Sequence, residues 1–141
     1  HLSIRRQRQM CIRDSLDIVS KSENFCGIKE SSGEIDRIDF LIKKYPNIAL
    51  CCGMDDQAYE YFQAGVKSWV CAGSNFSANA HIALWKTCVV EKNFNKGKKI
   101  WDAMLPLMKN LEQGGQVSEE SQGMQGAQQM FETSERLREV I

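Results

Sequence analysis

The stretch that sets the fold is FCGIKESSGE, residues 25–34. Its first half is an apolar run that is typical of a buried strand and ends in Lys29. Apolar residues then recur at helical spacing over residues 35–42, which predicts an amphipathic helix directly after the strand. Ser31 and Glu34 fit the S-x-x-E capping box that would start this helix. A strand followed at once by a helix is the repeating unit of an α/β fold.

The same unit recurs twice further along the chain. Apolar runs at 48–52 and 68–72 predict two more strands, and Asp55 and Ser77 are predicted to cap the helices that follow them. A long helix is predicted from about residue 95 to 111. Apolar strands alternating with amphipathic helices indicate a parallel sheet covered by helices. Doubly wound sheets and (β/α)8 barrels both fit this order, and three strands alone cannot close a barrel.

Composition excludes several classes of partner. Lys and Arg together number 18, as do Asp and Glu, so nothing indicates binding to nucleic acid or to an anionic membrane surface. No apolar run approaches the roughly 20 residues of a membrane-spanning helix. The six cysteines form no C-x-x-C pair and lack zinc-site spacing. We therefore expect no metal site, and we interpret the cysteines as buried, reduced thiols of a cytoplasmic protein.

The ends of the three predicted strands suggest a site. Parallel strands place their carboxyl ends at one edge of the sheet, where α/β proteins bind ligands. Lys29 stands at the first end, and Gly53 and Gly73 allow backbone to approach a ligand at the other two. A desolvated lysine loses its proton more readily, and the neutral amine forms Schiff bases with carbonyl compounds. The competing interpretation is a solvated lysine beside Glu30 in a weak surface pair, which local sequence alone favours.

Other candidate sites are weaker. His81 is interpreted as structural or solvated, because no partner residues suggest a triad or a metal site. The pair Asp55 and Asp56 could bind a cation, but a helix cap is the favoured interpretation of Asp55. The tryptophans predicted to serve packing are Trp69, Trp85 and Trp101. A small doubly wound domain that binds phosphate remains an alternative, although no phosphate-binding glycine loop is present.

Four motifs together resemble the dihydrodipicolinate synthase / N-acetylneuraminate lyase family. These proteins are Schiff-base aldolases and lyases built on a (β/α)8 barrel. The resemblance implies an incomplete TIM barrel here: about three parallel strands from its C-terminal part, plus C-terminal helices. The motifs are GIKESSG (27–33), CGMDD (52–56), AGVKSWVCAGSNF (64–76) and FNKGKKIWDAMLPLMKNLEQGG (94–115).

The resemblance also assigns roles to residues. It implies that Lys29 is the sixth-strand lysine that forms the Schiff base with pyruvate. Gly53 matches a position that lines the pyruvate pocket, and Val70 matches the residue whose backbone carbonyl faces the site. The implied partners are pyruvate or another 2-oxo acid and an aldehyde, with no cofactor. The full-length proteins of the family are expected to be homo-oligomers.

Parts of the family pattern have no counterpart in these 141 residues. The family's catalytic tyrosine and Thr-Thr pair belong to the first five strands, so we expect this chain by itself to be inactive or nearly so. A related 2-oxo acid sugar aldolase or dehydratase and a non-catalytic half barrel that needs a partner are the alternatives. Residues 1–15 are interpreted as a non-native leader, 16–115 as the C-terminal half of the aldolase domain and 116–141 as a divergent tail.

Overall fold

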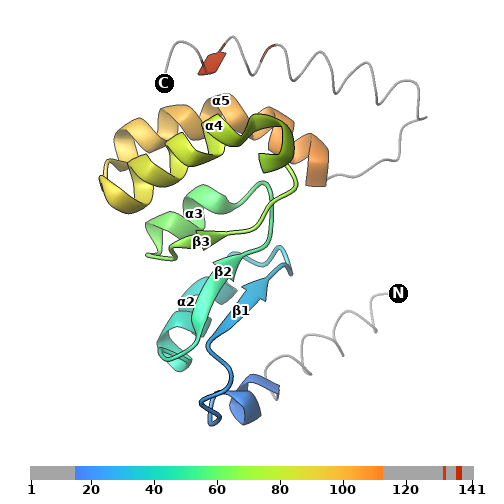
Figure 1. Cartoon of the computed structure of the whole chain (residues 1–141), viewed down its shortest axis with the longest axis vertical. Helices are drawn as coiled ribbons and strands as arrows, with labels where there is room; N and C mark the ends of the chain where they lie inside the picture. Colours follow the sequence, from blue (N-terminus) through green and yellow to red (C-terminus); the bar gives the residue numbers. More distant parts are fainter. Residues whose placement is uncertain (1–14, 113–131, 133–135, 138–141) are drawn as a thin grey trace, which may run out of the picture.

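Three parallel strands form one sheet, confirming the predicted α/β class. The computed structural model describes residues 15–112, 132, 136 and 137 (Figure 1). The strands follow the order β1-β2-β3, so chain neighbours are also neighbours in the sheet. Lys29 lies opposite Cys51 in the register of the first two strands, and Cys51 lies opposite Ser68. The strands are β1 (Gly27–Glu30), β2 (Ala49–Cys52) and β3 (Ser68–Trp69).

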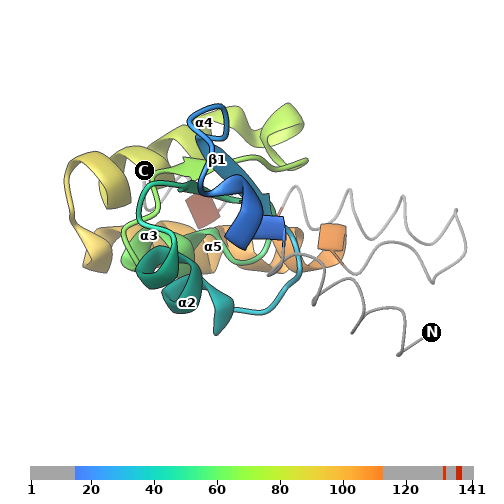
Figure 2. The same ribbon diagram turned by 90° about the horizontal axis from the view of Figure 1, so that it is seen from below.

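Helices connect the strands and follow the last of them, as the sequence predicts. Figures 1 and 2 show α2 and α3 next to each other on one side of the strands, and α4 beside α5. A π-helical segment, η1, continues α4 before the chain turns into α5. The helical elements are α2 (Arg37–Lys44), α3 (Ala58–Gln63), α4 (Ser74–Trp85), η1 (Lys86–Val90) and α5 (Phe94–Glu112).

Among the described residues, helices cover the strands on one face only. Side chains of successive strand residues point to opposite faces. Leu50 and Cys52 are buried beneath the helices, whereas Ala49 is exposed and Cys51 is only half-buried. The described residues supply no second layer over the face that carries Ala49. We call this face, which bears Gly27, Lys29, Ala49 and Cys51, the open face of the sheet.

The core lies around Trp69, where the sheet meets the long helices. The Trp69 ring contacts Phe62 of α3 and Trp101 of α5 edge to face, at 6.1 and 6.2 Å between ring centres. It stacks on the His81 ring of α4 at 4.6 Å. Trp69 and Trp101 therefore serve packing as predicted, while Trp85 is 39% exposed. These contacts fix the third strand against α3, α4 and α5.

The helix starts predicted at Ser31 and Asp55 are wrong. α2 begins at Arg37, so Ser31 and its capping-box partner lie well before it. α3 begins after Gln57, and the Asp55 carboxylate accepts a hydrogen bond from the backbone N–H of Gly73 instead of capping the helix. α4 begins before Ser77, but Ser77 itself has non-helical backbone angles at a kink between two helical segments, so the second segment does start after it; the Ser77 hydroxyl donates to the Gly73 carbonyl at 3.0 Å. For Ser31 and Asp55, a partner far along the chain binds the polar group that a local pattern assigns to a cap.

The third strand is shorter than the predicted 68–72. The backbone N–H of Val70 still donates to the Cys52 carbonyl at 2.9 Å, and β2 ends at that residue. The chain then turns, and the Ser74 hydroxyl donates to the Cys71 carbonyl at the start of α4. Within the described ranges, no helix has the length and apolar character needed to cross a membrane.

The five described cysteines fall into three burial classes, since Cys51 and Cys71 are half-buried between the two extremes. Cys52 and Cys88 are fully buried and unbonded, as the interpretation of reduced core thiols expects. Burial raises the pKa of the Cys52 thiol to about 12 and that of Cys88 to about 11. Cys26 is exposed, which corrects the prediction for that residue. It precedes β1 at the end of the sheet opposite Lys29, where no described helix covers it.

Candidate active site

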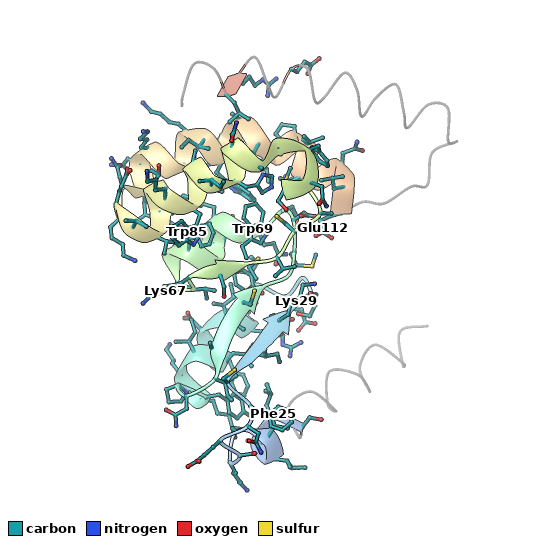
Figure 3. The ribbon with its side chains drawn as sticks, in the orientation of Figure 1. Phe25, Lys29, Lys67, Trp69, Trp85 and Glu112 are labelled. Carbon is teal, nitrogen blue, oxygen red and sulfur yellow. The ribbon has the colours of Figure 1, made fainter. Side chains whose placement is uncertain are left out.

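Lys29 lies near the carboxyl end of β1 and points to the open face of the sheet. Figure 3 shows it at the end of the strand farther from Phe25. Its neighbour Glu30 points to the opposite, helix-covered face and is only 3% exposed. The alternation of a strand thus separates the two charges, one toward solvent and one into the interior. The solvated pair of Lys29 with Glu30 is therefore wrong.

The Lys29 side chain is exposed, so the partial burial expected from the sequence is absent among the described residues. Its ammonium Nζ donates a hydrogen bond to Ser31 Oγ at 3.2 Å. The Ser31 hydroxyl in turn donates to the Gly53 carbonyl at 3.4 Å, at the end of the neighbouring strand. The lysine is thus tied across the ends of β1 and β2.

Gly53 makes this close approach feasible. A Cβ at Gly53 would lie 2.0 Å from Ser31 Oγ and 2.8 Å from both Lys29 Cγ and the Glu30 carbonyl oxygen. Real Cβ atoms do not come so close to other heavy atoms, and two of the three neighbours belong to the lysine's own strand. The backbone N–H of Gly53 donates to the Glu30 carbonyl at 2.8 Å, which fixes the glycine in place. Lys29 and Gly53, predicted as site residues, do lie side by side.

A buried ion pair supports the strand from the other face. Arg37 Nη2 lies 3.4 Å from Glu30 Oε2, with side chains 7% and 2% exposed. Glu30 Oε1 also accepts a hydrogen bond from the Ser32 N–H at 2.7 Å, so the carboxylate fixes the loop after the lysine. Burial raises the pKa of nearby Tyr61, and the Glu30 charge adds to this while the Arg37 charge opposes it. Neither the pair nor its burial is evident from the sequence, because Arg37 has the spacing of a solvated helix face.

Val70 directly follows β3 and is the third predicted site residue. Its backbone is held by the hydrogen bond to Cys52, and its side chain is 56% exposed. The parallel register places the end of β2 between it and Lys29. The predicted use of its carbonyl in a substrate pocket stays a prediction.

A second polar cluster lies at the strand ends, between β2, α4 and α5. The Asp55 carboxylate is buried and binds the Gly73 N–H, while Glu112 accepts from the Asp55 N–H. His81 Nδ1 lies 2.8 Å from the Ser77 carbonyl, and its Nε2 is buried with no hydrogen-bond partner among the described atoms. Burial lowers the pKa of His81, while the hydrogen bond with the Ser77 backbone and, less strongly, the charge of Asp55 oppose this.

His81 is therefore structural, one of the two predicted interpretations. It packs against Gly73, where a Cβ would lie 3.0 Å from Nε2 and 2.9 Å from Met108 Cε. Gly73 thus permits close helix packing, and the expected approach of its backbone to a ligand stays a prediction. In the described part of the chain, no three His, Cys, Asp or Glu side chains gather as a metal centre requires.

Comparison with known proteins gives a consistent family assignment. The model of the dihydrodipicolinate synthetase family matches residues 9–131. Curated relatives include the 4-hydroxy-tetrahydrodipicolinate synthases of Campylobacter jejuni subsp. jejuni and of Campylobacter jejuni subsp. doylei. Each is 33% identical over 94 residues, which is 63% of this chain and 30% of the relative.

The chain therefore spans about a third of the length of the curated relatives it matches. No solved structure matches it. The family match extends beyond the predicted domain limits at residues 16 and 115 on both sides. The interpretation of the end segments as leader and tail stays a prediction, because their structure lies outside the described residues apart from 15 and three positions near the C-terminus.

Proposed function

Because this chain belongs to the dihydrodipicolinate synthetase family, we propose that it carries the Schiff-base lysine of a lyase or synthase that acts on a 2-oxo acid, with Lys29 as the nucleophile. The observation that supports this most is the place of Lys29. It is the lysine at the carboxyl end of a parallel strand, on the open face, with its amine tied toward Gly53. Reactive groups gather at this edge in α/β barrels.

The proposed chemistry begins with the neutral amine of Lys29. Its lone pair attacks C2 of pyruvate, and loss of water leaves a C=N bond that is protonated on nitrogen. This iminium withdraws electrons from C3, so C3 can lose a proton and become a carbon nucleophile. Attack of C3 on an aldehyde carbon forms a carbon–carbon bond, and the aldehyde oxygen takes up a proton. Hydrolysis of the iminium then releases product and restores the amine.

Two more residues have proposed places around the substrate. Gly53 would leave space for the 2-oxo acid beside the lysine, and the Val70 carbonyl would face it from the third strand. The curated relatives are named 4-hydroxy-tetrahydrodipicolinate synthase, so we favour that reaction, in which pyruvate condenses with aspartate semialdehyde. A related sugar acid aldolase or dehydratase would use the same lysine with a different second substrate.

The 141 residues alone are expected to have little or no turnover. The resemblance places a proton-relaying tyrosine and a Thr-Thr pair on strands that have no counterpart here, and the match covers 30% of the relatives. Imine formation needs fewer groups than a full catalytic cycle. Adduct formation is therefore the sharper test.

The test is to incubate the folded chain with pyruvate, reduce with borohydride and map peptides by mass spectrometry. We expect a reduced pyruvate adduct at Lys29 and none in the Lys29→Arg variant, which keeps the charge but not the nucleophile. A sample reduced without pyruvate is the blank. A chain shown to be folded by circular dichroism that gives no adduct at Lys29 would contradict the proposal.

A half barrel that associates with a partner is a second candidate, favoured by the free edge of the sheet. A cavity of about 510 Å³ lies between β3 and α4. Its walls include Val70, Ile82 and Trp85, which are 56%, 60% and 39% exposed. Apolar surface beside an unpaired strand favours association. Sedimentation velocity should show concentration-dependent oligomers that Ile82→Lys weakens, whereas a monomer at every concentration would exclude this candidate.

A further inference from the structure

The Ser31 hydroxyl lies between the Lys29 amine and the backbone of the neighbouring strand. We propose that Ser31 is a positioning residue that holds the Lys29 amine over the open face. The Ser31 hydroxyl can occupy this place because residue 53 is glycine and has no Cβ. This inference rests on the proposed function for its catalytic meaning. Its geometry stands independently of any substrate.

The lysine needs such a restraint because its surroundings offer little else. Lys29 is exposed, and a free lysine side chain samples many rotamers, so holding its amine in one place has an entropic cost. The hydrogen bond at 3.2 Å selects rotamers that bring Nζ back toward the loop after β1. A nucleophile confined near one position reacts more often from that position.

The direction of each hydrogen bond follows from the groups involved. An ammonium group only donates, so Ser31 Oγ must accept from Lys29 Nζ. The single hydroxyl hydrogen of Ser31 then points to the Gly53 carbonyl, 3.4 Å away. When the amine loses its proton, the same hydroxyl can turn and donate to the nitrogen lone pair. Ser31 can therefore hold the lysine in both protonation states.

Gly53 provides the space for this hydroxyl. A Cβ there would stand 2.0 Å from Ser31 Oγ, so any other residue must displace the hydroxyl or the strand end. The Gly53 N–H is already bonded to the Glu30 carbonyl, and that bond opposes movement of the strand end. We therefore expect Gly53→Ala to break the contact between Ser31 and Lys29 without touching either residue.

Three variants separate positioning from general structure. Ser31→Ala removes the hydroxyl, and Ser31→Thr keeps it. Ser32→Ala is the matched control, because the adjacent Ser32 hydroxyl accepts from the Glu34 N–H at 3.2 Å and has no contact with the lysine among the described interactions. Both serines are exposed, so all three variants should fold, which circular dichroism checks.

The first measurement is the Nζ–H signal of Lys29 in a ¹H–¹⁵N spectrum of the lysine ammonium groups, assigned with Lys29→Arg. A hydrogen-bonded ammonium exchanges its protons with water more slowly than a free one. We expect a resolved signal in the wild type, Ser31→Thr and Ser32→Ala, and its loss by exchange broadening in Ser31→Ala and Gly53→Ala. An unchanged Lys29 signal in Ser31→Ala would overturn the proposal.

The second measurement is the rate at which pyruvate and borohydride trap Lys29. Loss of one hydrogen bond at an exposed ammonium should slow trapping about three- to tenfold in Ser31→Ala. Ser31→Thr should restore the rate to within about twofold, and Ser32→Ala should leave it unchanged. Equal rates in Ser31→Ala and the wild type would refute the positioning role.

The two measurements test the proposed function and the role of Ser31 separately. If the wild type forms no adduct, the proposed function is contradicted, while the ammonium signal still decides whether Ser31 holds Lys29. If the adduct forms but the signal does not depend on Ser31, the proposed function stands and the inference about Ser31 falls.

Discussion

Replacement of Gly97 by alanine tests how tightly α5 packs against η1. A Cβ at Gly97 would lie 2.3 Å from Cys88 Sγ, and Cys88 is fully buried. Favourable contacts between heavy atoms lie at about 3.5–4.0 Å, so the sulfur or the helix must move by more than about 1 Å. Because Cys88 is buried, its sulfur can move only against other core atoms, so we expect the helix contact to be strained.

Two opposing effects set the magnitude. Alanine favours a helix interior over glycine by up to about 1 kcal/mol. Overpacking a closely packed site costs about 1–3 kcal/mol. We expect overpacking to dominate, so that Gly97→Ala lowers the free energy of unfolding by about 1–2 kcal/mol. In a Cys88→Ala background the clash is gone, and the same substitution should become neutral or stabilising by up to about 1 kcal/mol.

Urea unfolding followed by tryptophan fluorescence measures these differences, because Trp101 is buried on the same helix. Asn95→Ala is the matched control, since this exposed residue of α5 reports helix propensity without the clash. The sign reversal between the two backgrounds is the decisive result. If Gly97→Ala destabilises the chain equally with and without the Cys88 sulfur, the packing argument is refuted.

Three further perturbations address the buried charges and thiols. Arg37→Leu should lower the free energy of unfolding, measured in urea, by about 3 kcal/mol, because it leaves the Glu30 carboxylate buried without a cation. Adding Glu30→Leu should recover most of this loss. A double variant as unstable as the single variant would contradict the argument. Burial lowers the pKa of His81, so the unfolded chain binds a proton first as the pH falls. The free energy of unfolding should then decrease from about pH 7 toward about pH 5.5, and it should decrease less steeply in His81→Asn. Equal pH dependence in the two proteins would argue against this role of His81. Iodoacetamide should modify exposed Cys26 in the folded chain. It should spare Cys52 until urea unfolds the protein, because burial raises the pKa of the Cys52 thiol to about 12. Peptide mapping that finds both cysteines modified at similar rates would show the core to be open.

The order of the elements could be predicted from the sequence because it depends on repeated local patterns. Apolar runs of strand length alternate with helical spacing three times, and the structure has that order. The position of Lys29 at a strand end follows from the same pattern, since the run that ends there is short and a turn follows. The long helix was predicted from about 95 to 111 and spans Phe94–Glu112.

The predictions for single polar side chains failed where a distant partner competes with a local one. Asp55 has the sequence context of a helix cap, yet its carboxylate binds the N–H of Gly73, 18 residues away. Ser31 has the context of a capping box, and its hydroxyl contacts Lys29 and Gly53 instead. Gly53 and Gly73 reach these side chains only through the fold, so no spacing along the chain reveals them.

The burial of Glu30 was missed for a related reason. Its neighbour in the sequence is a lysine, which favours a solvated pair when only local order is considered. Strand geometry sends the two side chains to opposite faces, and Arg37 then meets the carboxylate from α2. The alternation rule could have supplied this distinction, because it assigns adjacent residues of a strand to different surroundings.

The opposite orientations of Lys29 and Glu30 have a consequence for how β1 can pair with β2. A slip of one residue in their register would exchange every side chain between the two faces. It would place a carboxylate where Lys29 now lies and bring the lysine beside Arg37, so that two cations would be buried together. The guanidinium of Arg37 therefore penalises the wrong alignment of the strand as well as stabilising the right one.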